Sequence, residues 1–189
     1  MKYALTVLAT LAVLGVGALV FPYTGFMNVA ATAGHSGIEQ WYLSTMSRRS
    51  IQARAGNAAV PDVLTDSTTI ARGAFAYREM CQTCHGGPDI ERSVTGQGIT
   101  PTPPYLTETA GEWKPNQVFW IVQNGIKMAG MPAYGPTHTD EELWELVAFV
   151  KQLPEMTPER YAALTTPDDA SAADTSATPL ADDGHDHTH

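Results

Sequence analysis

The chain has 189 residues, of which 43% are hydrophobic, so it can form one compact domain with additional segments but not two large domains. Its formal net charge of -9 argues against nucleic acid as a partner and favours basic patches on another protein. We find no internal repeat.

Residues 1–21 are predicted to form a membrane helix. After Lys2, an uncharged apolar run extends from Tyr3 to Phe21, and its length of about 19 residues is enough to cross a bilayer. A cleaved signal peptide is the alternative, because Ala31-Thr32-Ala33 has the small-residue form that a signal peptidase accepts. The run is longer than an ordinary signal core, so we favour a retained anchor. Either outcome places the remaining chain outside the cytoplasm.

Residues 22–65 are predicted to be a linker followed by an amphipathic helix. Small residues dominate positions 28–37, and a helix is expected from Ser36. Its apolar residues stand near helical spacing, and its arginines cluster in the later turns: Ile38, Trp41, Tyr42 and Met46, then Arg48, Arg49 and Arg54. Three surfaces suit this helix: an anionic membrane, a partner protein or the following domain. His35 is interpreted as a polar loop residue, although a larger assembly could use it as a ligand.

Residues 66–86 carry the most informative motif. Asp66 or Ser67 can cap a helix whose apolar face leads into Cys81-Gln82-Thr83-Cys84-His85. This CxxCH sequence uses both cysteines of the chain and is the attachment signature of one c-type haem. The two thiols add across the haem vinyl groups, and the adjacent histidine then binds the iron. We therefore expect one covalent haem c.

Three other interpretations of the cysteine pair are weaker. A thioredoxin-like redox pair requires a βαβ pattern, whereas the sequence before Cys81 is helical and the sequence after it is a loop. A structural zinc ion requires four ligands, so two histidines would have to come from scattered positions. A disulfide across two intervening residues would be strained and would constrain little.

The remaining part of the domain is predicted to be a loop and two helices. Residues 86–111 are rich in Gly, Pro and Thr and are expected to form an extended wrap around the haem edge. Helices are expected from Asn116 to Asn124 and from Asp140 to Leu153. Thr139 and Glu142 form a capping box for the second helix.

A methionine opposite the histidine is expected in an electron-transfer haem, because thioether ligation favours the ferrous state. Of seven methionines, only Met128 and Met131 lie in a loop between helices of the predicted haem domain. Met131 is favoured because Pro132 keeps the backbone out of a helix and Gly130 permits close approach to the porphyrin. Met128 and an open or His138-ligated site remain as alternatives.

The chain resembles the class I c-type cytochromes over about residues 66–154. Gly73 and Tyr77 precede Cys81 at the spacing of that family's first helix, and residues 146–151 look like its last helix. The resemblance implies an all-α cytochrome c-like fold in which these two helices cross near Gly73, allowing the face of Leu146 and Phe149 to approach. The proline-rich loop and the segment 36–60 are departures from the short cytochromes of this family.

The same resemblance implies the roles of the site residues. His85 would be the proximal iron ligand and Met131 the distal one. A proline carbonyl after the haem motif would accept a hydrogen bond from His85, with Pro104 as the candidate and Pro88 as the alternative.

These observations predict an electron carrier rather than an enzyme. An iron bound by His85 and Met131 has no open position for a substrate, and no catalytic group is evident elsewhere in the sequence. Its partners would be respiratory or dehydrogenase redox proteins, with the haem domain held on the periplasmic side of the membrane or soluble there after signal cleavage. One alternative is a haem subunit of a membrane oxidoreductase complex. Another is a haem enzyme or gas sensor with a labile Met131.

Four segments are therefore expected: 1–21 as anchor or signal, 22–65 as linker and amphipathic helix, 66–161 as the haem domain and 162–189 as a disordered acidic tail. The tail ends in His185, His187 and His189, a pattern that can hold a transition metal weakly. A solvated tail without bound metal is the simpler interpretation.

Overall fold

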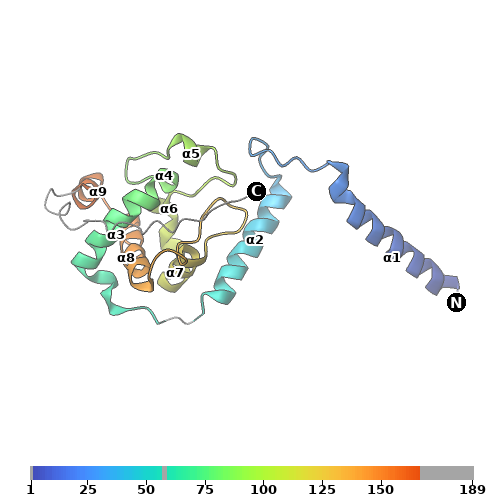
Figure 1. The fold of residues 1–189 in the computed structure, drawn as a ribbon, viewed down its shortest axis with the longest axis horizontal. Helices are drawn as coiled ribbons and strands as arrows, with labels where there is room; N and C mark the ends of the chain where they lie inside the picture. Colours follow the sequence, from blue (N-terminus) through green and yellow to red (C-terminus); the bar gives the residue numbers. More distant parts are fainter. Residues whose placement is uncertain (1, 57–58, 167–189) are drawn as a thin grey trace, which may run out of the picture.

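The computed structural model describes residues 2–56 and 59–166. Within these ranges the chain is helical, and strand-like pairing is limited to isolated bridges, which confirms the all-α prediction. The helices after residue 62 form a bundle beside the longer helix of residues 37–54 (Figure 1). The elements are α1 (Lys2–Val20), η1 (Phe21–Thr24), α2 (Gly37–Arg54), η2 (Asp62–Thr65), α3 (Ser67–Met80), α4 (Gln82–His85), α5 (Val94–Gln97), α6 (Leu106–Thr109), η3 (Ala110–Glu112), α7 (Pro115–Asn124), α8 (Asp140–Val150), η4 (Leu153–Glu155) and α9 (Pro158–Thr165).

The N-terminal helix α1 extends away from the other helices (Figure 1). Together with η1 it gives an apolar helical segment from Lys2 to Thr24, 23 residues long and without buried residues. This length and composition suit a membrane span and equally suit a signal sequence.

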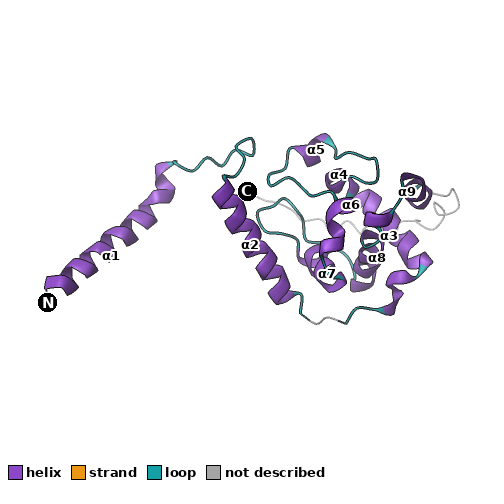
Figure 2. Cartoon of the chain, turned by 180° about the vertical axis from the view of Figure 1, so that it is seen from behind, coloured by secondary structure: helices purple, strands orange, loops and turns teal. Residues whose placement is uncertain are grey.

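Helix α2 begins at Gly37 with Ser36 as its N-cap, in agreement with the helix predicted from Ser36. The Ser36 hydroxyl accepts a hydrogen bond from the Glu39 N–H, and the Glu39 carboxylate accepts one from the Ser36 N–H. These two bonds satisfy amide groups that the first turn of a helix leaves without partners. Helix α2 lies along one flank of the helical bundle and contacts α7 (Figure 2).

The core is organised by the crossing of α3 and α8, the most extensive contact between helices. Gly73 makes the crossing possible, because a Cβ at this position would overlap the backbone of Glu145 and approach the Phe149 Cβ to 3.0 Å. The predicted role of Gly73 is confirmed. The buried side chains of α8 fill the space beneath it: Leu143, Leu146, Val147, Ala148, Phe149 and Val150.

The C-terminal part of the domain differs from the prediction. Helix α8 ends at Val150 instead of Leu153, because residues 153–155 tighten into η4. A further helix, α9, had no counterpart in the sequence analysis, and the expected boundary at residue 161 falls inside it. Its Tyr161 is buried, and the Tyr161 ring centroid lies 5.9 Å from that of Phe149. Its buried residues are few, so the sequence shows little apolar periodicity over this segment. The tail from residue 167 onward, with its three histidines, lies outside the described residues.

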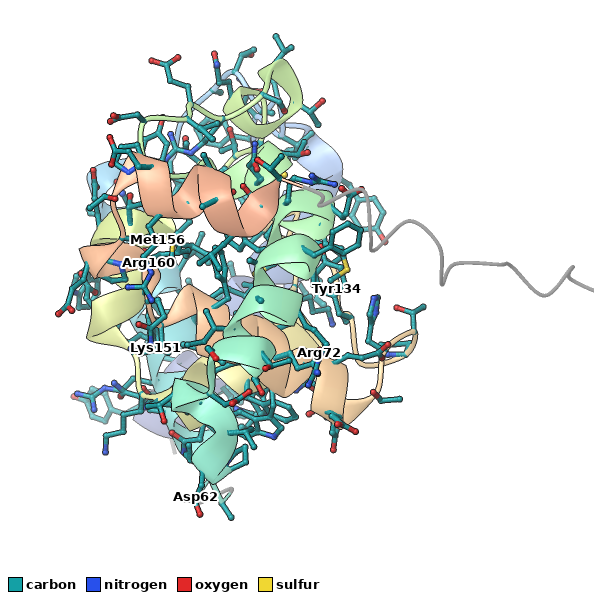
Figure 3. All side chains as sticks on the ribbon, turned by 90° about the vertical axis from the view of Figure 1, so that its left-hand side faces the viewer. Asp62, Arg72, Tyr134, Lys151, Met156 and Arg160 are labelled. Atoms are coloured by element: carbon teal, nitrogen blue, oxygen red, sulfur yellow. The ribbon has the colours of Figure 1, made fainter. Side chains whose placement is uncertain are left out.

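The loop 86–111 is less extended than expected. It contains the short helices α5, α6 and η3, so the prediction of a purely extended wrap was wrong. Lys151, the C-cap residue of α8, holds the C-terminal end of this loop against that helix. Its ammonium group donates hydrogen bonds of 2.7 Å to the carbonyls of Ala110 and Trp113. Figure 3 shows Lys151 and Tyr134 on opposite sides of the domain in that view.

Candidate functional site

The CxxCH residues lie where α3 ends and α4 begins. Cys81 is the C-cap residue of α3. The His85 N–H donates a 2.9 Å hydrogen bond to the Cys81 carbonyl, so helical geometry continues through the motif. Residues three and four apart in a helix share one face. Cys84 and His85 therefore lie on the same side of the helix as Cys81.

The ring of His85 is held by a carbonyl of the proline-rich loop. Its Nδ1 atom lies 2.8 Å from the carbonyl oxygen of Pro104. Because that oxygen can only accept, Nδ1 donates, and Nε2 keeps its lone pair for a metal. Burial lowers the pKa of His85, the bond to Pro104 raises it, and the positive charge of Arg92 lowers it, with a net decrease. The imidazole is therefore neutral at pH 7, as a metal ligand must be.

Pro88, the alternative partner for His85, lies elsewhere. It is in a tight turn in which the Gly87 N–H donates to the Ile90 carbonyl and the Ile90 N–H donates back to the Gly87 carbonyl. This turn packs near α9, where Pro88 and Tyr161 line the same surface depression. Of the two prolines, only Pro104 contacts the histidine ring among the hydrogen bonds of residues 2–56 and 59–166.

Met128 and Met131 have different surroundings in the loop between α7 and α8. Met131 is partly buried against the hydrophobic core, and its carbonyl accepts a hydrogen bond from the Ile126 N–H at 3.2 Å. Met128 is 92% exposed and has a left-handed backbone conformation, with φ of 61°. The geometry thus presents Met131 toward the interior of the domain and Met128 toward solvent.

The methionine loop is attached directly to the helix that carries the cysteines. The hydroxyl of Tyr134 donates a hydrogen bond of 3.0 Å to the carbonyl of Met80, the residue before Cys81. Tyr134 is labelled in Figure 3, where it lies beside α3. Burial raises the pKa of Tyr134 to about 12, so the hydroxyl stays protonated and can donate. This contact joins the sequence-distant halves of the candidate site.

The two cysteines form no disulfide, and the burial of Cys81 disfavours its thiolate form. Burial, with a smaller contribution from Cys84, raises the pKa of Cys81 to about 12. A redox-active cysteine pair requires a lowered pKa, because the thiolate is the reactive species. Among the described residues, no group of three His, Cys, Asp or Glu side chains is placed to hold a metal ion.

Arg92 is a site residue that the sequence analysis missed. Its Nε atom is buried and has no hydrogen-bond partner within the described part of the chain. Its guanidinium carbon lies 3.5 Å from the ring centroid of Tyr105, and its positive charge contributes to the lowered pKa of His85. Arg92 is partly buried as a whole, and its buried Nε–H is a hydrogen-bond donor near His85. A haem carboxylate would suit this donor. The sequence held one indication, since Arg92 is the only basic residue in the loop 86–111.

Comparison with known protein families gives one match that covers this site. Residues 68–150 match the family model described as cytochrome C oxidase, cbb3-type, subunit III. This part of the chain is a class I c-type cytochrome domain. The match contains the CxxCH motif, Arg92, Pro104 and Met131. Searches of curated proteins and of solved structures gave no match.

Family membership establishes the general chemistry of the domain. Domains of this family bind haem c covalently and transfer electrons, and residues 81–85 supply the attachment sequence. Such domains function outside the cytoplasm, in agreement with an N-terminal apolar helix that is either an anchor or a signal sequence.

Proposed function

We propose that this cytochrome is a single-electron carrier with one covalent haem c, held by thioether bonds to Cys81 and Cys84 and ligated by His85 and Met131. One haem is expected because the chain has only two cysteines. The bound group supplies the one-electron iron couple. The residues of the chain attach it, orient it and set its electrostatic environment.

The observation that carries the proposal is the 2.8 Å hydrogen bond from His85 Nδ1 to the Pro104 carbonyl. A ligating histidine in proteins nearly always donates its other ring N–H to such an acceptor, which fixes the tautomer and the ring plane. The lowered pKa of His85 supports the same role, because a protonated imidazole cannot bind iron.

Met131 is proposed as the second ligand on its position in the loop. Its partial burial and the bond of Tyr134 to Met80 support a thioether held close to the cysteine helix. Two protein ligands would leave the iron no open position for a substrate. This is why we infer a carrier rather than a haem enzyme.

The proposed location is the membrane, with α1 as a retained anchor and the haem domain on the periplasmic side. The 23-residue apolar segment has the required length. Partners are inferred to be redox proteins of a respiratory or dehydrogenase system, which fits an acidic protein with a net charge of -9.

A second proposal is that the chain is a subunit of a membrane oxidoreductase complex. The description of the matching family, an oxidase subunit, favours it. The two proposals share the haem site and differ in whether the cytochrome dissociates from its partner. Extraction in mild detergent as a single small species would contradict stable membership of a complex.

The test of the haem proposal is the optical spectrum of the oxidised and reduced protein. We expect the weak sulfur-to-iron charge-transfer band of a methionine-ligated ferric haem, and we expect carbon monoxide to leave the reduced spectrum unchanged. A missing band together with rapid carbon monoxide binding would show an open distal position. The protein would then be a haem enzyme or a gas sensor.

A further inference from the structure

Helix α2 has two faces with different surroundings. Its C-terminal half is attached to the haem domain through buried Ile51 and Ala55. Arg48 forms a 3.1 Å ion pair with Glu112, and its guanidinium lies 4.9 Å from the ring centroid of Trp113. One side of α2 therefore packs against the haem domain.

The outer face of α2 is apolar and uncovered. Four large apolar side chains on this face are 54 to 81% exposed: Ile38, Trp41, Tyr42 and Met46. Their spacing of three, four and eight residues from Ile38 places them on one helix face. We call these four residues the outer stripe. A row of exposed apolar side chains of this size indicates a surface that binds a membrane or another protein.

The position of the outer stripe in the chain points to the bilayer. The apolar segment ends at Thr24, and α2 begins at Gly37. The chain between them can span at most roughly 47 Å when fully extended. The linker is also tied to the loop 86–111, because the Thr100 hydroxyl donates a 2.6 Å hydrogen bond to the Ala31 carbonyl, and this shortens the free part of the linker. An anchored α1 therefore keeps α2 near the membrane surface.

The residue types agree with a membrane interface. Trp and Tyr concentrate where headgroups meet acyl chains, because each ring has an apolar body and a polar edge. Basic residues adjoin the outer stripe. A depression of about 350 Å³ on α2 is lined by Ser44, Thr45, Arg48, Arg49 and Gln52; Arg48 is paired with Glu112, and Arg49 forms no ion pair among the described residues. Hydroxyl and guanidinium groups of this kind bind phosphate. The basic surface is notable in a chain with a net charge of -9.

We propose that α2 lies along an anionic phospholipid surface, with the outer stripe inserted at the interface and Arg49 facing lipid phosphates. This inference rests on the proposed membrane anchor. Because the opposite side of α2 is fixed to the haem domain, α2 would hold that domain in one orientation over the bilayer. The negative charge elsewhere would disfavour other orientations, since an anionic surface repels it.

The experiment uses the full-length, haem-loaded protein in vesicles. In the loaded protein the native thiols are bound to haem, so an introduced cysteine is the only reactive one. Tyr42→Cys places a fluorescent label on the outer stripe. Gln40→Cys is the matched control, since Gln40 is an exposed residue of the same helix but lies on another face. Vesicles contain phosphatidylcholine alone or with an equal amount of phosphatidylglycerol.

We expect nitroxide-bearing lipids to quench the label at position 42 in the mixed vesicles. We also expect quenching of this label by iodide to fall by roughly threefold or more in these vesicles. The label at position 40 should stay accessible to iodide. Arg49→Gln should reduce the protection at position 42 in mixed vesicles and have no effect in neutral ones. Equal iodide accessibility at positions 42 and 40 in mixed vesicles would overturn the proposal. Protection at position 42 in native membranes but not in vesicles would also overturn it, and would assign the outer stripe to a protein partner.

Two controls separate this inference from the proposed function. The visible spectrum of each labelled sample reports on the haem site, and an open distal position there would leave the result at position 42 unaffected. Sequencing of the N-terminus of the native protein reports on the anchor. A cleaved α1 would remove the proposed membrane attachment, and the proposal would then fail for that reason, with the haem assignment intact.

Discussion

The buried hydroxyl of Tyr77 donates a hydrogen bond of 2.9 Å to the carbonyl of Gly86, which closes the turn that carries Cys81, Cys84 and His85. The Tyr77 side chain has no exposed surface, and burial raises its pKa, so the hydroxyl remains a donor across the physiological range. The helix before the haem motif and the residue after it are thereby joined through one bond.

Removing this hydroxyl should destabilise the domain. Tyr77→Phe leaves the buried Gly86 carbonyl without its donor, and we expect the free energy of unfolding to fall by about 1 to 3 kcal/mol. The measurement is chemical denaturation of the haem-loaded protein. Tyr105→Phe is the control, because the Tyr105 hydroxyl makes no hydrogen bond within the described residues. Equal stability of the two variants would contradict a structural role for the Tyr77 hydroxyl.

The crossing of α3 and α8 predicts that Gly73 tolerates no side chain. In Gly73→Ala the added methyl group would overlap the backbone of Glu145, so the helices must separate. We expect a loss of about 3 kcal/mol or more, since neither backbone can move away cheaply. Gly111→Ala is the matched control, because an added Cβ there meets nothing within 4 Å. Thermal unfolding of both variants provides the comparison. Similar midpoints would show that the crossing is looser than described.

The sequence revealed features that depend on local spacing and missed those that depend on contacts across the fold. The start of a helix at Ser36 and the cap at Thr139 follow local rules and were predicted correctly, whereas the role of the crossing glycine Gly73 came from the family resemblance. Arg92 could not be found in this way, because only the folded structure shows that its Nε atom is buried without a hydrogen-bond partner and that its guanidinium lies over the Tyr105 ring. The same reason applies to Tyr134, whose bond to Met80 spans 54 positions of the chain.

Helix α9 was missed for a different physical reason. It contributes one buried aromatic ring, Tyr161, whose hydroxyl donates a 2.7 Å hydrogen bond to the side chain of Gln82 in the haem motif. Most of its other residues are exposed, so the sequence shows little periodicity. The segment is stabilised by tertiary contact with α3 more than by its own propensity.

Arg92 is expected to raise the reduction potential of the haem. A fixed positive charge near the site stabilises the form with one more electron, so its removal should lower the potential. We expect a decrease of about 20 to 60 mV in Arg92→Leu, since 59 mV corresponds to about 1.4 kcal/mol for one electron. Arg92→Lys keeps the charge and should recover most of the decrease. A redox titration followed optically measures both. An unchanged potential in Arg92→Leu would show that Arg92 faces solvent counter-ions and not the haem.

Asp66 predicts an acid-sensitive component of stability. Its carboxylate caps α3 by accepting hydrogen bonds from the Thr69 N–H at 2.8 Å and from the Thr69 hydroxyl at 2.9 Å. These bonds lower the pKa of Asp66 in the folded state. The stabilisation is therefore present above the ordinary Asp pKa of about 3.9 and is lost as the pH falls through the lower folded value.

The variant Asp66→Asn separates this component, because asparagine keeps a capping oxygen without the charge. We expect the wild-type protein to be more stable than the variant at pH 7 and the difference to shrink progressively as the pH falls below the ordinary Asp pKa of about 3.9. Denaturation of both proteins across this pH range is the measurement. A difference that stays constant with pH would assign the effect to the shape of the cap and not to its charge.

The two loop methionines provide the sharpest test of the ligand assignment. Met131→Ala should remove the sulfur-to-iron band and allow carbon monoxide to bind the reduced haem, because the partly buried thioether is absent. Met128→Ala should leave both properties unchanged, since the Met128 side chain is 92% exposed and makes no contribution to the core. The pair is matched in residue type and lies in one loop. If Met128→Ala removed the band instead, the loop would have to turn over on haem binding, and the hydrogen bond from the Ile126 N–H to the Met131 carbonyl would have to break.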